Sequence, residues 1–299
     1  MTESIGAVLK GKMESSLLNV TTSKIMEWQA CLRKYAISHG KLYAVSDTET
    51  TGTSTYCGVK DVVHRVLEWS IIFCVEDENG LLLPCVDGVG EPIIINEPIN
   101  PFAYPGRSPK SKKTISEIPL EAIGVHGITM EYLFGVSEVK DETGKVIREK
   151  LKAPAPSFES VFDAVRLLLD FPEYLSTECP VVILFHNSAR KSNDVSIFDV
   201  RFLTNESEMW ELPPLESFFF PIDTARLAAQ VIDKSIAKKY SLDSLHDLGR
   251  TMYPDVIKDV ARPFHSSSVD SFILIEVYNT IMWYRKQAKD LMSGGKNAN

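Results

Sequence analysis

Apolar and polar positions along the chain follow two repeats, one typical of strands and one typical of helices. Apolar runs of strand length occur within 42–52, 62–75, 81–86, 181–185 and 218–222. Helical spacing, with apolar residues three or four positions apart, covers 23–39, 158–171, 198–203 and 272–282, and further helices are expected from Asp223 and from 241–245. Two antiparallel strands followed by helices and strands predict an α/β protein with a mixed sheet.

Proline and charge mark the segments that interrupt this order. Residues 84–119 hold seven of the sixteen prolines, so they are predicted to form a long loop. This segment also carries the basic residues Arg107, Lys110, Lys112 and Lys113. The basic cluster fits contact with a phosphate backbone as well as a solvated loop, and both interpretations stay open. A hairpin insertion is predicted at 136–150, and 293–299 are expected to be disordered.

The first 40 residues are predicted to form a helical extension. Their apolar stripe consists of Ile25, Trp28, Leu32 and Tyr35. Ser23 is placed to cap a helix of about four turns, and Gly40 is placed to end it. The stripe is expected to pack on the domain that follows; docking of a partner protein is the alternative.

Composition limits the class of protein but does not indicate an activity. The net charge of −8 excludes a general nucleic-acid coat, although a local basic patch or a metal can still serve a nucleic-acid substrate. The five cysteines contain no CxxC pair and indicate free thiols in a reducing compartment. No apolar run reaches membrane-span length, and Glu3 and Glu14 interrupt any secretory signal pattern. We therefore expect an intracellular, cytoplasmic protein without a membrane partner.

The chemistry of the chain is concentrated first in 42–52, LYAVSDTETTG. Successive side chains of a strand point to opposite faces, so Asp47 and Glu49 share one face. Two neighbouring carboxylates repel unless a proton or a cation relieves them, and oxygen ligands suit Mg²⁺ or Mn²⁺. An isolated Asp-x-Glu is more often only a polar strand end, so the assignment depends on further acidic residues downstream.

Further candidates appear later in the chain. Asp199 begins a predicted helix, and His265 and Asp270 precede and enter the apolar C-terminal helix. Each one alone would be an ordinary charge at a helix start. As an ordered set with Asp47 and Glu49 they favour a functional site.

Five segments in a fixed order carry a family resemblance. They are DTETTG at 47–52, GVHGIT at 124–129, HN at 186–187 with FDVRFL at 198–203, YSLDSL at 240–245 and HSSSVD at 265–270. This series resembles the DEDDh 3′ to 5′ exonucleases, a DnaQ-like family that includes the epsilon proofreading subunits of bacterial DNA polymerase III. The resemblance covers 41–285 and implies a ribonuclease H-like fold, with an exonuclease domain at 41–292 that has insertions near 84–119, 136–150 and 188–197.

Phosphodiester hydrolysis needs an activated water, stabilised phosphoryl oxygens and help for the leaving alkoxide, which two metal ions can supply together. In this interpretation Asp47 bridges two Mg²⁺ or Mn²⁺ ions, and Glu49 and Asp270 complete the nucleophile side. Asp199 completes the leaving-group side. His265, with an ordinary pKa of about 6.5, accepts the proton of the attacking water.

The resemblance also implies substrate contacts. Thr50, Thr51 and Gly52 are expected to contact the terminal nucleotide through backbone amides. His126 and Asn187 are weaker candidates, because GVHGIT and HN either shape the loops of the active cleft or only hold them.

One departure from the family concerns the third acidic residue. In the family two residues separate HN from FD, whereas ten residues, 188–197, intervene here. Asp199 is preferred because FDVRFL provides its frame, and Asp194 within the insertion is the alternative.

These observations predict a metal-dependent 3′ to 5′ exonuclease that releases nucleoside 5′-monophosphates from single-stranded DNA ends, with proofreading as one setting. An RNA-trimming or short-oligonucleotide exonuclease is the first alternative. A docking subunit associated with a polymerase or another replication or repair protein is the second.

Overall fold

The protein is described here in a computed structural model. The structure describes residues 22–53, 62–103, 113–140, 143–171, 181–186, 198–231 and 266–294. Several sequence predictions therefore lie outside the described residues. These are the roles of His265, Asn187 and Asp194, the helix at 241–245, the insertion at 188–197 and the basic residues Arg107, Lys110 and Lys112.

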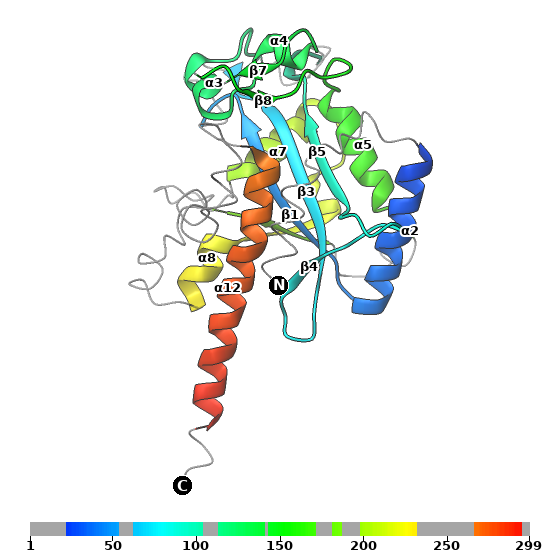
Figure 1. Cartoon of the computed structure of the whole chain (residues 1–299), viewed down its shortest axis with the longest axis vertical. Helices are drawn as coiled ribbons and strands as arrows, with labels where there is room; N and C mark the ends of the chain where they lie inside the picture. The colour runs from blue at the N-terminus through cyan, green and yellow to red at the C-terminus, as the bar shows by residue number, and fades with distance from the viewer. Residues whose placement is uncertain are drawn as a thin grey trace.

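A mixed sheet forms the centre of the molecule (Figure 1). Its order is β10 (Phe219–Asp223), β9 (Val181–Phe185), β1 (Tyr43–Thr50), β3 (Val66–Glu76) and β4 (Leu82–Pro84). Strand β1 is antiparallel to β3 and parallel to β9, and β9 is parallel to β10. This arrangement confirms the predicted α/β class with a mixed central sheet flanked by helices. All five residues of β9 are buried, as expected of a strand in the middle of a sheet.

A sixth strand corrects the prediction that 84–119 is wholly irregular. Strand β5 (Ile94–Pro98) pairs with β3 beside β4, so the two strands share one edge of β3. Pro92 and Pro98 flank a proline-free run that begins with Ile93, Ile94 and Ile95, all buried. The prolines therefore bound the strand instead of interrupting it. The described remainder of this segment holds a short 3₁₀ helix, η2 (Pro101–Ala103), and strand β6 (Lys113–Thr114).

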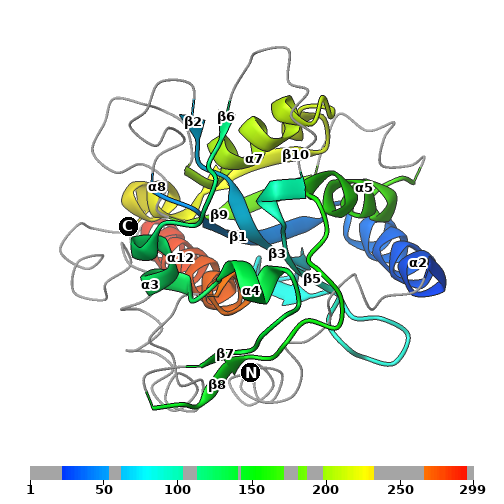
Figure 2. The same cartoon turned by 90° about the horizontal axis from the view of Figure 1, so that it is seen from above.

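Helices cover both faces of the sheet, as Figure 2 shows. One core contains residues of α2 (Thr22–His39), α5 (Phe158–Leu168) and α7 (Phe198–Met209). The other contains residues of α8 (Thr224–Val231) and α12 (Ser267–Gly294). Alternation along β1 matches this division, because Ala44 belongs to the first core and Tyr43 and Val45 belong to the second.

Several helix and strand boundaries differ from the predictions. Helix α2 begins one residue before Ser23, and Gly40 ends it with φ 72°. Its residues Trp28 and Leu32 are buried in the core, so the predicted packing is confirmed. Helix α5 ends before 171, whereas α12 reaches Gly294 and enters the expected tail.

Residues 62–75 do not form one strand. Val62–Val63 forms β2, which pairs with β6 in a separate small sheet, while β3 begins at Val66. The register between β1 and β3 shifts after Glu49, so that Glu49 lies opposite Glu68 and Thr50 lies opposite Val66. Leu67 is the extra residue of this β-bulge, and its side chain enters a third core.

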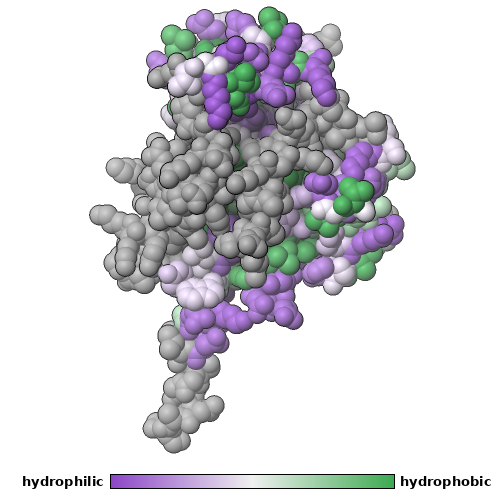
Figure 3. Space-filling view, viewed as in Figure 1, coloured by the Kyte–Doolittle hydropathy of each residue, from purple (hydrophilic) through white to green (hydrophobic). Residues whose placement is uncertain are grey.

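That third core belongs to a cap, defined here as α3 (Leu120–His126), α4 (Met130–Leu133), β7 (Val139–Lys140) and β8 (Val146–Arg148). The antiparallel pairing of β7 and β8 confirms the predicted hairpin. Gly127 ends α3 in the left-handed conformation, and the Thr129 side chain caps α4. The cap lies over the end of the sheet where α12 begins, and its surface mixes hydrophilic and hydrophobic residues (Figures 1 and 3).

The described chain is completed by η3 (Leu215–Ser217), a short 3₁₀ helix ahead of β10. Among the residues that the structure describes, no helix is both long enough and apolar enough to cross a membrane.

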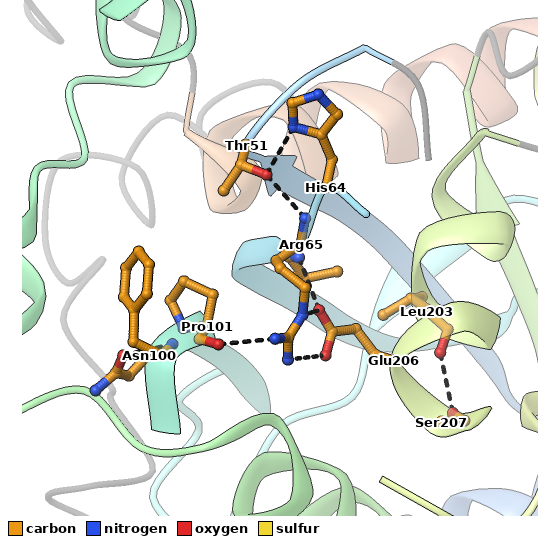
Figure 4. Close-up of polar contacts among 10 residues, drawn as sticks. Thr51, His64, Arg65, Asn100, Pro101, Leu203, Glu206 and Ser207 are labelled. Atoms are coloured by element: carbon orange, nitrogen blue, oxygen red, sulfur yellow. Dashed lines mark hydrogen bonds and ion pairs between the residues drawn. The ribbon is translucent and has the colours of Figure 1, made fainter. Parts of the chain in front are cut away.

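A buried ion pair joins Arg65, the residue before β3, to Glu206 of α7 (Figure 4). Nε and Nη2 of Arg65 donate to the two carboxylate oxygens of Glu206 at 2.6 and 2.7 Å, and Nη1 donates to the Pro101 carbonyl at 2.8 Å. Both side chains are at most 2 % exposed. The pair therefore holds the helix that carries Asp199 against the strand beside β1.

Replacing Glu206 by Gln should destabilise the protein by about 3–5 kcal/mol, because the Arg65 charge would stay buried without its counter-charge. Chemical denaturation followed by circular dichroism measures this change. Asp163→Asn is the matched control, because it breaks a half-exposed pair with Arg166 and should change the stability by no more than about 0.5 kcal/mol. Equal stabilities of the two variants would contradict the assigned role of the buried pair.

Candidate metal centre

Three carboxylates meet where β1 ends and α12 begins. Asp47 and Glu49 point to the α12 face of β1, as their spacing of two predicts. Asp270 lies in the first turn of α12, where its backbone N–H donates to the Ser266 carbonyl at 3.0 Å. Ligand atoms of the three residues lie within 4.8 Å of one another. Residues 47, 49 and 270 thus come together as the sequence predicted.

The electrostatics of this cluster favour a cation. Burial and the charges of Asp270, Asp199, Glu49 and Glu68 raise the pKa of Asp47 well above its ordinary value. A divalent ion would relieve this repulsion, and a donor set made only of carboxylate oxygens suits a hard ion such as Mg²⁺ or Mn²⁺. The residues present therefore fit the predicted metals.

Asp199 stands outside this group of three. The Thr48 hydroxyl donates to its carboxylate at 2.6 Å, and Thr48 points to the face of β1 opposite Asp47 and Glu49. Burial raises the pKa of Asp199 to about 6 against the effect of the Thr48 hydrogen bond, and the charge of Asp223 adds to the rise. The charge of Asp199 is close enough to raise the pKa of Asp47, but the carboxylate of Asp199 is hydrogen-bonded to Thr48, the residue after Asp47.

The turn after β1 is held by its own hydrogen bonds. Thr51 donates its backbone N–H to the Arg65 carbonyl at 2.9 Å, and its hydroxyl accepts from Arg65 N–H at 2.8 Å. The Thr51 amide therefore has a hydrogen-bond partner within the protein, and its contact with a nucleotide stays a prediction. The Thr50 hydroxyl donates to the Gly52 carbonyl at 2.7 Å. Contacts of Thr50 and Gly52 with substrate stay predictions.

Gly52 packs closely against the side chain of His64. A Cβ atom at this position would lie 2.5 Å from Cε1 of the His64 ring, and the ring also bonds to Thr51 Oγ1 at 3.0 Å. The Thr-Thr-Gly sequence thus lets His64 lie directly on the turn.

His126 is buried in the cap, 1 % exposed, and its Nδ1 accepts from the Ile128 N–H at 3.0 Å. Of the two interpretations of GVHGIT, this position favours the one in which the motif holds a loop. It does not favour a direct contact between His126 and substrate. Gly127 and Thr129 of the same motif supply helix caps, which explains the motif locally.

One charged residue near the site was missed by the sequence predictions. Glu68 of β3 lies opposite Glu49 and is 1 % exposed. Burial would raise its pKa, but the charge and hydrogen bonds of Arg148 and the hydrogen bonds of Ser267 lower it to about 2. An acidic residue within the apolar strand sequence VLEWSIIFCVE is the signal that could have found it.

Comparisons with known proteins give a structural likeness alone. No family profile matches the chain, and no curated protein matches it. Among solved structures the chain is similar to S. pombe Pop2p in its Mg²⁺ and Mn²⁺ bound form, with a TM-score of 0.38 and 12% sequence identity. The similarity covers 88% of this chain and 90% of that chain.

Proposed function

We propose that this protein is a metal-dependent 3′ to 5′ exonuclease that releases nucleoside 5′-monophosphates from single-stranded DNA ends. The observation that carries the proposal is the convergence of Asp47, Glu49 and Asp270 within 4.8 Å. These residues span 223 positions of the sequence, and the sequence motifs alone predict all three as ligands of one site.

The proposed cofactors are two Mg²⁺ or Mn²⁺ ions held by Asp47, Glu49 and Asp270, with Asp199 as the fourth carboxylate. When bound, such ions supply Lewis-acid stabilisation of the phosphoryl oxygens and lower the pKa of water. Asp199 is held by two contacts of the protein. Thr48 donates a hydrogen bond to its carboxylate, and the Arg65–Glu206 ion pair anchors α7, the helix that carries it.

His265 is the proposed general base. It lies outside the described residues, so its support is the HSSSVD motif, which ends at Asp270. A histidine suits the role because its ordinary pKa of about 6.5 lets it accept a proton near neutral pH.

Substituting Asp47 or Asp270 by Asn should slow nucleotide release by roughly 100-fold or more, because a loss of about 3 kcal/mol of charge stabilisation has that effect. Release of mononucleotides from a 3′-labelled single strand measures the change. Without metal, Asp47→Asn should unfold at the same or a higher temperature than the wild type, because the substitution removes repulsion. An Asp47→Asn variant that retains full activity would refute the assignment, and Asp163→Asn serves as the surface control.

The choice between DNA and RNA is tested with matched single strands of one sequence, digested with Mg²⁺ or Mn²⁺. The proposal predicts faster digestion of DNA, with mononucleotides as the first products from the 3′ end. Faster digestion of RNA would favour the RNA-trimming alternative. Inactivity on both, with and without a polymerase, would leave only the docking role.

Gly52→Ala should lower kcat/KM by roughly 10- to 100-fold, because the added Cβ would displace the His64 ring or the turn beside the site. Binding of Mn²⁺ should stay unchanged, because neither residue is a proposed ligand. The double variant Gly52→Ala/His64→Ala opens the space and should recover activity to the level of His64→Ala alone. A double variant as impaired as Gly52→Ala would show that crowding by His64 is not the cause.

A further inference from the structure

Glu68 occupies an unusual place beside the acidic cluster. It belongs to β3, opposite Glu49 across the β1–β3 pair, and its side chain points to the face covered by α12. Its charge is among those that raise the pKa of Asp47. A buried carboxylate that adds to this repulsion needs a compensating role.

The carboxylate of Glu68 binds the first residue of α12. Oε2 accepts from the Ser267 backbone N–H at 3.1 Å and from the Ser267 hydroxyl at 2.8 Å. The first backbone N–H groups of a helix have no partner within the helix, so a carboxylate there fixes where the helix begins. Asp270 follows Ser267 by three residues, within the same helical turn.

Arg148 holds Glu68 from the side of the cap. Its Nη1 and Nη2 donate to the two oxygens of Glu68 at 2.5 and 3.3 Å. Its Nε donates to the His126 carbonyl at 3.2 Å, and its guanidinium lies 5.6 Å from the centre of the Tyr132 ring. One arginine thus joins α3, α4 and β8 of the cap to β3 and, through Glu68, to α12.

We propose that Glu68 is a positioning residue of the metal centre: it sets the first turn of α12 and thereby Asp270, and Arg148 makes this position depend on the cap. The inference rests on the proposed function of the Asp47–Glu49–Asp270 cluster. Stability alone would not require this pair, because a buried Arg–Glu pair is often no more stabilising than apolar side chains of the same size. What an apolar pair lacks is an acceptor for the Ser267 N–H and hydroxyl.

The test compares Mn²⁺ affinity, measured by calorimetric titration of the full chain, between Glu68→Gln and the wild type. We expect an approximately tenfold weaker affinity, in the range seen when a group that orients a metal ligand is removed. Ser267→Ala keeps the Glu68–Arg148 pair intact and removes one of the two hydrogen bonds from Ser267 to Glu68, together with a longer contact to Asn96, so it should weaken Mn²⁺ binding in the same direction by a smaller factor.

Asn279→Ala is the matched control. Asn279 is the polar tether of α12 to β4, because its side chain bonds to both the N–H and the carbonyl of Leu82 at 2.6 and 3.2 Å. It lies nine residues beyond Asp270, about 13 Å along the helix. This variant should lower the unfolding temperature and leave Mn²⁺ affinity unchanged.

Each result decides a separate claim. Weaker binding by Glu68→Gln and also by Ser267→Ala, which keeps the Glu68 charge, with unchanged binding by Asn279→Ala supports the positioning role. Wild-type affinity in Glu68→Gln, or equal weakening in Asn279→Ala, overturns it and leaves the proposed function standing. If Glu68→Gln does not fold, Ser267→Ala decides by the same criteria. A wild-type protein that binds no Mn²⁺ overturns the metal centre itself.

Discussion

Repulsion among buried carboxylates at the end of β1 is the constraint around which this end of the molecule is built. Asp47 has Glu49, Asp270, Asp199 and Glu68 near enough to raise its pKa. Two of these acids have different hydrogen-bond donors in the surrounding structure. Thr48 donates to Asp199, and Arg148 and Ser267 donate to Glu68. Asp47, Glu49 and Asp270 bring ligand atoms within 4.8 Å of one another, an arrangement that fits a divalent cation.

The two sides of the sheet and the cap each supply a charged residue to this region. The α12 face of the sheet supplies Asp270, the α7 face supplies Asp199, and the cap supplies the arginine that neutralises Glu68. Polar contacts between residues far apart in the sequence hold these layers together. Arg65 and Glu206 are 141 positions apart, and Glu68 and Ser267 are 199 positions apart. A metal centre at this position would therefore depend on packing throughout the chain.

Local sequence patterns predicted the parts of this arrangement that depend on nearest neighbours. Alternation placed Asp47 and Glu49 on one face, and helical spacing placed Asp199 and Asp270 in first turns. The same reasoning failed for β5, because the prolines of 84–119 indicate a loop although a short isoleucine run between two of them forms a strand. It also missed Glu68, whose partners lie 80 and 199 residues away in the sequence. Periodicity predicts which face a side chain occupies, whereas the partner on that face comes from tertiary packing.

The bulge at Leu67 has a consequence for how β3 can vary. Within four positions the strand sends Val66 and Trp69 into the core under α7, Leu67 into the cap and Glu68 to α12. An insertion or deletion of one residue here would rotate all of these side chains at once into the wrong surroundings. Insertions and deletions among related proteins should therefore be absent from this stretch of β3 and concentrated in the connections outside it. Sequence alignments in which the loops differ in length can then be anchored on this strand.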